Sequence, residues 1–256
     1  MTTIIEKEWI AGTPPLWVRH SAGAKQCPGC HHPLVERIVA EVLTEMGLEG
    51  KAIGVSGIGC SGRIFMVIPI DTVAAAHGKA PDVATGIKRS LDGKPFVFTI
   101  QGDGDAIAIG AGALINAAGR AEKITVLMNN NATYGTTGGQ MAPTTLMGQV
   151  TTTSPLGRGP EMGYPIHVAE LLATIKGVCY SARGAVNTPA NYQRTKKYIR
   201  TAFQKQMDGV GFSFVETLTA CPPDWHMTPM QSLEFIEKKM IPEYPLGEFK
   251  NVDKIE

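Results

Sequence analysis

Short apolar runs alternate with helical patterns along most of this chain, and this alternation constrains the fold more than any other feature. Five of the runs have the length and composition of buried strands. Strands that alternate with helices predict a parallel sheet covered on both faces, so we expect a doubly wound, mostly parallel α/β fold. The predicted strands are residues 51–56, 96–101, 123–129, 178–183 and 212–218, and the predicted helices are 106–118, 167–175 and 189–206.

The segment 132–163 differs from the rest because it is rich in Thr, Gly and Pro. It directly follows the end of a predicted strand. Ligands of parallel sheets bind beyond the carboxyl ends of the strands, and long loops in compact domains are usually functional or disordered. We therefore expect an ordered active-site loop at 132–163. Nearer the C-terminus, Pro229 predicts the start of a short helix.

Charge and cysteine content exclude several classes of protein. The 24 basic and 23 acidic side chains nearly cancel, so no charge field favours nucleic acid or an anionic membrane as a partner. No apolar run reaches the length of a membrane span, and Glu6, Lys7 and Glu8 stand where a signal peptide would be apolar. These features predict a cytoplasmic protein. Its five cysteines then favour metal or redox chemistry over a disulfide framework.

Two polar motifs follow separate predicted strands. The sequence GDGD at 102–105 comes directly after the strand 96–101, and three asparagines at 129–131 end the strand 123–129. Glycine lets the backbone approach a diphosphate, and the start of the next helix offers free N–H groups. Carboxylate and amide oxygens suit Mg²⁺. Each motif alone is typical of a solvated turn, but together at strand ends they predict a site for Mg²⁺ and a diphosphate.

Four cysteines lie in loops flanked by Gly or Pro, where a thiolate is free to bind a metal. They suit either a [4Fe–4S] cluster or a structural zinc ion, and their spacing does not decide between the two. Cys179 lies inside a predicted strand and is expected to pack in the core. His31 and His32 are candidates for ligands or for structural hydrogen bonding. The four loop cysteines are Cys27, Cys30, Cys60 and Cys221.

Gly57, Gly59 and Gly62 have the spacing of the dinucleotide-binding fingerprint. That fingerprint also requires a helix that opens directly and an acidic residue about 20 positions further on. Pro69 interrupts the following segment and Asp71 comes too early. The sequence therefore argues against a nicotinamide-dinucleotide site.

Taken in order, six motifs make the chain resemble the β subunits of 2-oxoacid:ferredoxin oxidoreductases, which are thiamine-diphosphate enzymes. They are CPGC at 27–30, GIGCSG at 57–62, HGKAPDVATGIK at 77–88, GDGDAIAIG at 102–110, NNNATYGTTGGQMAPT at 129–144 and ACPP at 220–223. The resemblance covers about residues 25–229 and implies a thiamine-diphosphate-binding (diphosphate-domain) fold, with residues 1–256 as a single domain. It also implies that an N-terminal CxxC segment (about 20–33) and a C-terminal extension (about 221–256) close over an iron–sulfur cluster.

The resemblance assigns ligands residue by residue. It implies that Mg²⁺ binds Asp103, the side chain of Asn131 and the backbone carbonyl of Thr133, because the family's ligating Asn stands three residues before a tyrosine, here Tyr134. It implies a [4Fe–4S] cluster on Cys27, Cys30, Cys60 and Cys221. His31, in place of a usual glycine, and Ala132-Thr133, in place of a Gly-Ile type pair, depart from the family pattern. The residues expected around thiamine diphosphate are Ile58, Gly59, Cys60, Ser61, His77, Gly102, Gly104, Asp105, Gly135 and Thr136.

The resemblance further implies oxidative decarboxylation of a 2-oxoacid to an acyl-CoA and CO₂, with coenzyme A as co-substrate and single electrons passing through the cluster to ferredoxin. The glutamate that activates the cofactor is expected on a separate α subunit with the pyrimidine-binding domain, so the chain alone should be inactive. Further γ and ferredoxin-like δ subunits are candidate partners. The alternatives are a non-redox thiamine-diphosphate decarboxylase subunit with a structural zinc site, and a non-catalytic cysteine–metal interaction protein.

The motifs do not identify the oxoacid. The segment 134–145 has no charged side chain, and in the wider loop only Arg158 offers a cation for the distal carboxylate of 2-oxoglutarate. If 2-oxoglutarate is the substrate, the counter-charge is expected on Arg158 or on the partner subunit. A branched-chain or aryl oxoacid remains open.

Overall fold

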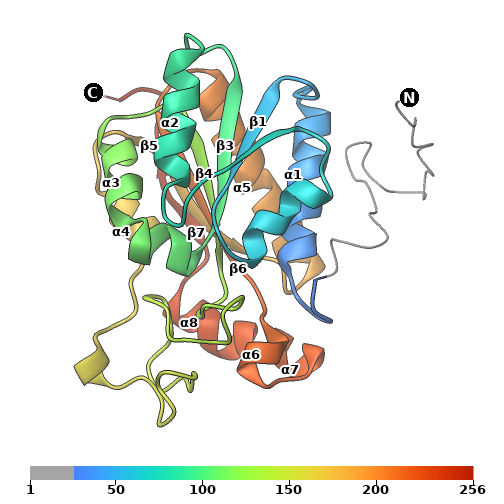
Figure 1. Ribbon diagram of the computed structural model, residues 1–256, viewed down its shortest axis with the longest axis vertical. Coiled ribbons are helices and arrows are strands. Elements are labelled where there is room, and N and C mark those ends of the chain that lie inside the picture. The colour runs from blue at the N-terminus through green and yellow to red at the C-terminus, as the bar shows by residue number, and fades with distance from the viewer. Residues whose placement is uncertain (1–25, 256) are drawn as a thin grey trace, which may run out of the picture.

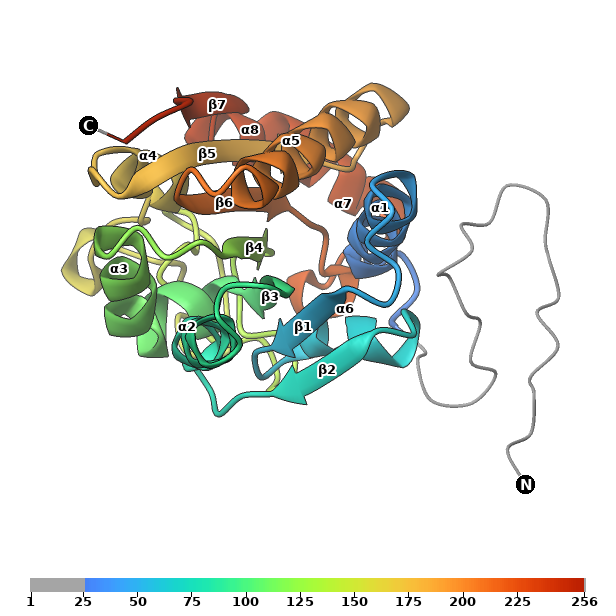
Figure 2. The same cartoon turned by 90° about the horizontal axis from the view of Figure 1, so that it is seen from above.

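A seven-stranded sheet runs through the centre of the computed structural model, which describes residues 26–255 (Figure 1 and Figure 2). The strand order is β2-β1-β3-β4-β6-β5-β7. Neighbouring strands are parallel except for β5 and β7, which are antiparallel. The predicted mostly parallel α/β fold is therefore confirmed. The strands are β1 Ala52–Ser56, β2 Asp71–Ala74, β3 Phe96–Gly102, β4 Thr125–Asn130, β5 Val178–Ala185, β6 Phe212–Leu218 and β7 Gly247–Asn251.

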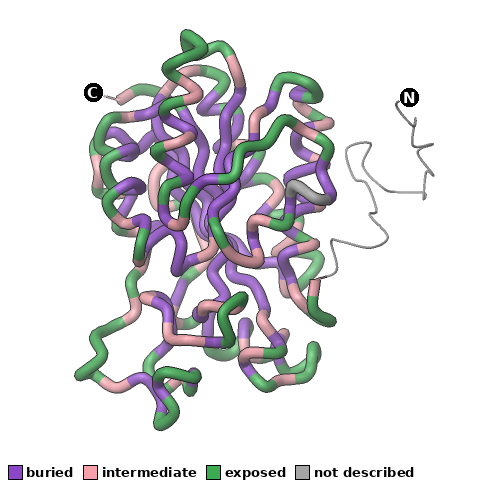
Figure 3. Tube along the Cα trace, in the orientation of Figure 1, coloured by how far each residue is buried: buried purple, intermediate pink, exposed green. Residues whose placement is uncertain are grey.

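Helices cover both faces of the sheet. Figure 2 shows α1 and α5 on one face and α2, α3 and α4 on the other, and the five central strands between them are almost wholly buried (Figure 3). The α-helices are α1 His32–Glu45, α2 Ala80–Ser90, α3 Ala111–Gly119, α4 Val168–Ala173, α5 Pro189–Met207, α6 Pro222–Trp225, α7 Pro229–Phe235 and α8 Ile241–Glu243. Shorter 3₁₀ and π segments are η1 Cys60–Met66, η2 Gly104–Ile109, η3 Pro160–Met162 and η4 Ile236–Met240. None of these helices combines the length and the apolar composition needed to cross a membrane.

The long helix α5 begins where the sequence predicts it. Thr188 accepts a hydrogen bond from the backbone N–H of Asn191 at 3.1 Å, and Pro189 occupies the first helical position. The same physics starts α7, where Thr228 and Gln231 form a capping box ahead of Pro229. Both predicted helix starts are confirmed.

The helix predicted at 106–118 is interrupted, and the interruption shapes the site. Residues 104–109 form a π-helical segment, and α3 begins only after Gly110. A side chain at Gly110 would place its Cβ 2.3 Å from the carbonyl oxygen of Asp105 and 2.9 Å from that of Gly78. Because the loop at Gly78 presses against this point, only glycine fits and a regular helix cannot continue through it.

The sequence analysis missed the helices α1 and α2 and two strands, β2 and β7, which are the edge strands of the sheet. All four residues of β2 are exposed, and β7 is partly exposed and polar. Neither strand has the apolar run that identifies a buried strand. The C-terminal part divides in two: α6 to α8 pack around Trp225 and Tyr244 near the carboxyl ends of the strands, and β7 then returns to the sheet edge. Residues 20–25 of the predicted CxxC segment and Glu6 to Glu8 lie outside the described residues.

Candidate functional site

A pocket lies where β1, β3 and β4 end, at the carboxyl edge of the sheet. All ten residues predicted around thiamine diphosphate line it, together with the three predicted Mg²⁺ ligands. His32, Asn129, Tyr134 and Thr137 complete the lining. The structure thus brings together the start of α1 and the segments that follow β1, β2, β3 and β4, at the end of the sheet where parallel folds bind ligands.

Asp103 stands at the end of β3 and is only 2% exposed. Its carboxylate accepts hydrogen bonds from the backbone N–H of Gly104 at 2.8 Å and from the hydroxyl of Thr144. Burial raises the pKa of Asp103 to about 7, although those two hydrogen bonds oppose the rise. A buried carboxylate whose hydrogen-bond donors are all neutral is well suited to a cation.

The loop after β4 brings the other two predicted Mg²⁺ ligands beside Asp103. Asn131 is 6% exposed, and its backbone carbonyl accepts a hydrogen bond from the indole N–H of Trp225 at 3.0 Å. Thr133 donates its hydroxyl to the carbonyl of Gln140 at 2.9 Å, which orients this residue within the loop. The donor set of one carboxylate, one amide and one carbonyl matches the hard oxygen ligands of Mg²⁺.

Asp105 is as buried as Asp103 but has a different environment. Its carboxylate accepts hydrogen bonds from the backbone N–H groups of Ile58 at 3.2 Å and Gly78 at 2.8 Å, and it also bonds the side chains of His77 and Gln101. The side chain therefore joins the loops after β1 and β2 to the start of η2. Sequence reasoning missed this role. Because the carboxylate of Asp105 is occupied by these bonds, only its backbone is left to face a cofactor.

Two glycines of the motifs are required by close contacts and a third by its backbone conformation. A Cβ at Gly57 would lie 2.0 Å from the carboxylate of Asp105, and one at Gly104 would lie 2.1 Å from the ring of Tyr134. Gly59 has φ +130°, which a side chain disfavours. Glycine at positions 57 and 59 thus lets this loop pack closely against Asp105. A 3₁₀ segment follows these glycines in place of the α-helix that a dinucleotide fingerprint requires, so the loop is not such a fingerprint.

The described lining of the pocket contains no lysine or arginine. Burial lowers the pKa of His31 and of His32 to about 4, so both rings are neutral at pH 7. Asn129 donates to the hydroxyl of Ser61 at 3.3 Å, while its buried Oδ1 has no hydrogen-bond partner. A diphosphate in this pocket would therefore depend on a divalent cation and on backbone N–H groups for its neutralisation.

The four loop cysteines lie around one side of this pocket. Cys60 lines it and its Sγ is 3.0 Å from the hydroxyl of Thr136. Cys221 Sγ bonds Asp224 at 3.1 Å. It also lies beside Gly135, which belongs to the same loop as Thr136. The Cys30 thiol lies close enough to the other three cysteines to interact with them electrostatically. Burial raises its pKa to about 12. In the described part of the chain, no three His, Cys, Asp or Glu side chains are arranged to hold a metal ion.

The fifth cysteine, Cys179, lies fully buried in β5, where its Sγ is 3.3 Å from the carbonyl of Phe212. This is the core position that the sequence predicted. It lies apart from the pocket lining and from the four loop cysteines.

The suggested role of Arg158 as a counter-charge for the substrate is wrong. Its side chain is 5% exposed, and its guanidinium donates to the backbone carbonyls of Gly163 at 2.8 Å, Pro143 at 3.0 Å and Tyr164 at 2.9 Å. It also donates to the carbonyl of Thr145. Arg158 thus holds the active-site loop together, and the sequence could not reveal this because the acceptors are backbone groups.

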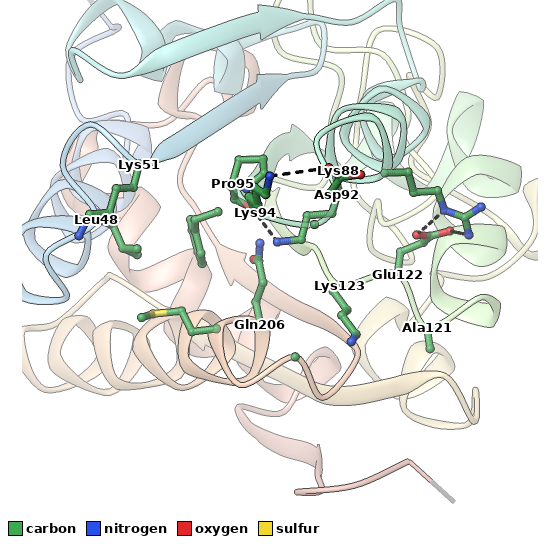
Figure 4. A pocket seen from close by; sticks show the side chains of 15 residues that line it. Leu48, Lys51, Lys88, Asp92, Lys94, Pro95, Ala121, Glu122, Lys123 and Gln206 are labelled. Carbon is green, nitrogen blue, oxygen red and sulfur yellow. Dashed lines mark hydrogen bonds and ion pairs between the residues drawn. The ribbon is translucent and has the colours of Figure 1, made fainter.

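A larger hollow, of about 740 Å³, lies at the opposite end of the sheet, beside the amino ends of β1, β3 and β4 (Figure 4). Most of the cations in its lining already have partners. Lys88 donates to the carbonyl of Pro95 at 2.6 Å, Arg89 pairs with Glu122, and Lys94 with Asp92. Because parallel sheets bind their ligands at the other end, we place the functional site at Asp103.

The sequence of residues 57–217 matches the family profile described as "Thiamine pyrophosphate enzyme, C-terminal TPP binding domain". Thiamine pyrophosphate is another name for thiamine diphosphate. The 2-oxoglutarate synthase subunit KorB of Archaeoglobus fulgidus is 37% identical over 214 residues, which cover 83% of this chain and 75% of the relative. The 2-oxoacid:ferredoxin oxidoreductase subunit beta of Saccharolobus solfataricus is 31% identical over 232 residues, 90% of this chain and 70% of the relative. The chain belongs to the 2-oxoacid:ferredoxin oxidoreductase family.

Other members of the family differ in length. The ketoisovalerate oxidoreductase subunit VorA of Methanothermobacter thermautotrophicus is 38% identical over 226 residues, which are 88% of this chain but 47% of the relative, so the chain spans about half of that protein. The solved 2-oxoglutarate:ferredoxin oxidoreductase of Magnetococcus marinus superposes with a TM-score of 0.77 at 24% identity, over 96% of this chain and 87% of that one. This structural likeness shows that the two share a fold.

Proposed function

We propose that this chain is the thiamine-diphosphate-binding β subunit of a CoA-dependent 2-oxoacid:ferredoxin oxidoreductase. The overall reaction converts a 2-oxoacid, coenzyme A and two oxidised ferredoxins into an acyl-CoA, CO₂, two reduced ferredoxins and one proton. Thiamine diphosphate, when bound, supplies the electron sink that lets the 2-oxoacid lose CO₂. Family membership and the pocket around Asp103 support the proposal together.

The single observation that carries it is the buried carboxylate of Asp103. It has neutral hydrogen-bond donors only, and it lies beside Asn131 and Thr133 in a pocket whose described lining has no lysine or arginine. These residues fit a Mg²⁺ ion that carries a diphosphate. Asp103, Asn131 and the carbonyl of Thr133 would hold the metal, and the backbone around Ile58–Ser61, Gly104 and Thr136 would contact the cofactor.

The four loop cysteines would hold a [4Fe–4S] cluster beside that cofactor. Cys60 belongs to the pocket lining, and Cys221 touches the loop that carries Gly135 and Thr136. Burial raises the pKa values of Cys30 and Cys221, so thiolates at these positions would need the positive charge of bound iron. The cluster would accept one electron at a time and pass it to ferredoxin. The segments at about 20–33 and 221–256 would close over it within a single domain, residues 1–256.

The remaining parts of the machinery are proposed for partners. An α subunit would supply the pyrimidine-binding domain and the activating glutamate, and γ and ferredoxin-like δ subunits are further candidates. The greater length of VorA is consistent with a need for additional protein. Because Arg158 is buried and its guanidinium donates to backbone carbonyls, a counter-charge for 2-oxoglutarate would also come from the partner. A cytoplasmic location belongs to this proposal.

The test is an anaerobic visible spectrum with iron and zinc analysis on the chain copurified with its partner subunit. About four irons per chain and bleaching by dithionite would support the redox enzyme. A colourless protein that holds zinc would favour the non-redox decarboxylase. Failure of Mg²⁺ and thiamine diphosphate to bind the complex would favour the non-catalytic metal protein. Full turnover by the chain alone would contradict the need for an α subunit.

A further inference from the structure

A buried ionic network lies directly behind the loop that carries two of the proposed Mg²⁺ ligands. Arg183 on β5 and Glu216 on β6 stand opposite each other in the sheet, and both side chains are completely buried. The Nε of Arg183 donates to Glu216 Oε2 at 2.8 Å. The other side of the guanidinium bonds Glu170, with Nη1 at 2.8 Å from Oε1. The network is therefore fixed from both sides.

The free oxygen of Glu216 reaches the last residue of β4. Asn130, also fully buried, donates its Nδ2 to Glu216 Oε1 at 2.7 Å. An ionised carboxylate only accepts hydrogen bonds, so Glu216 dictates which end of the Asn130 amide faces it. The Oδ1 of Asn130 must then point the other way, where it accepts a hydrogen bond from the backbone N–H of Ala132 at 3.0 Å.

Ala132 is the point of strain in this loop. It has φ +55°, a left-handed conformation that is unfavourable for a residue with a Cβ. The turn at Ala132 lets Asn131 on one side and Thr133 on the other both face the pocket that holds Asp103. The hydrogen bond from the backbone N–H of Ala132 to Asn130 closes this turn, while the hydroxyl of Thr145 donates to the Ala132 carbonyl at 2.7 Å.

We propose that Asn130, oriented by the Arg183–Glu216 pair, is a positioning residue that holds Ala132 in its left-handed turn and so aims Asn131 and Thr133 at the metal. This inference rests on the proposed function, because it concerns affinity for the Mg²⁺ ion of that site. Asn130 itself is absent from the pocket lining, so it acts only through the backbone.

The test is a calorimetric titration of Mg²⁺ into the full chain, copurified with its partner subunit and saturated with thiamine diphosphate. Asn130→Ala should weaken Mg²⁺ binding by roughly tenfold or more, the range seen when a residue that orients a ligand is lost. Ala132→Gly, added to Asn130→Ala, should restore much of the affinity, since glycine adopts the left-handed conformation without cost. A purely structural role for Asn130 predicts no such rescue.

A matched control separates this rescue from a general loosening of the core. Ala185 is fully buried and packs in the same cluster as Ala132, but it ends β5 and has no left-handed backbone. Ala185→Gly should not restore binding to Asn130→Ala. Unchanged Mg²⁺ affinity in Asn130→Ala, or equal rescue by both glycines, would overturn the inference.

A second variant keeps the test decisive if Asn130→Ala does not fold. Glu216→Gln is nearly isosteric and can donate as well as accept, so it no longer fixes the orientation of the Asn130 amide. It should lower Mg²⁺ affinity, and Ala132→Gly should again restore it; wild-type affinity in Glu216→Gln would refute the inference. If the wild-type complex itself binds no Mg²⁺, the proposed function fails, which is a separate result.

Discussion

The two aspartates of the GDGD motif should respond to the same substitution with opposite signs. Asp103 and Asp105 are each 2% exposed, but Asp105 accepts from two backbone N–H groups and also bonds two side chains, whereas Asp103 accepts from one backbone N–H and one hydroxyl that can rotate. Asp103 has neutral donors and a pKa raised by burial from 3.8 to about 7. In the metal-free chain, we therefore expect Asp103→Asn to stabilise the fold and Asp105→Asn to destabilise it.

The magnitude follows from the pKa of Asp103. A rise of about three units corresponds to a cost of at most about 4 kcal/mol for the ionised form above pH 7. Because the folded pKa is raised, the contribution of Asp103 to stability is fully present below pH 3.8 and is lost as the pH rises through about 7. The advantage of Asp103→Asn should thus grow between pH 4 and 7 and then stay constant. At pH 8, the maximum gain of about 4 kcal/mol corresponds to an increase in the Tm of Asp103→Asn on the order of 10 °C.

The new amide at position 103 has suitable partners. Its oxygen can accept from the N–H of Gly104, and its NH₂ can donate to the hydroxyl of Thr144, which can rotate to accept. At Asp105, an amide NH₂ would instead face a donor, and the unpaired groups should cost roughly 1 to 3 kcal/mol. Thermal unfolding in EDTA at pH 5 and pH 8 measures both variants.

Three results would refute this reasoning. The first is an Asp103→Asn variant that is no more stable than the wild type at pH 8. The second is a gain in Tm that is the same at pH 5 as at pH 8. The third is stabilisation of the chain by Asp105→Asn, which would mean that burial alone decides whether the substitution raises or lowers stability. Addition of Mg²⁺ and thiamine diphosphate should raise the Tm of the wild type and not that of Asp103→Asn.

Three further predictions test other parts of the structure. Arg158→Ala should lower turnover of 2-oxoglutarate and of branched-chain oxoacids by similar factors, since it loosens the whole loop; a selective loss for 2-oxoglutarate would contradict this. Cys30→Ala should lower iron content, whereas Cys179→Ala should leave it unchanged, as iron analysis can measure. Burial raises the pKa of Glu36 to about 7, so Glu36→Gln should raise the free energy of unfolding at pH 8 by up to about 3 kcal/mol and by less at pH 5; equal gains at both values would exclude that cause.

The central strands and the ends of β3 and β4 could be predicted because their residues carry the information locally. A strand buried on both faces is mostly apolar, and β3 is buried at all but its last residue. The polar residues that follow, Asp103 and Asn131, stand out against that background. Edge strands such as β2 lack this contrast, because exposed positions place no demand on residue type.

The roles of the buried charges could not be predicted for a different reason. Arg183 and Glu216 lie within predicted strands, and no spacing along the chain indicates that these strands pair in register. Their partnership exists only once β5 and β6 are neighbours. Asp105 and Arg158 are similar cases, since most of their partners are backbone groups of distant or irregular segments that side-chain patterns do not reveal.

The loop that follows β4 connects the two proposed metal sites. Its residue Asn131 bonds Trp225, which lies in the short helix that begins after Cys221. Further along the same loop, Thr136 bonds the Sγ of Cys60, and a Cβ at Gly135 would lie 3.5 Å from the Sγ of Cys221. A cluster on these cysteines would therefore contact the same short loop that carries the Mg²⁺ ligands.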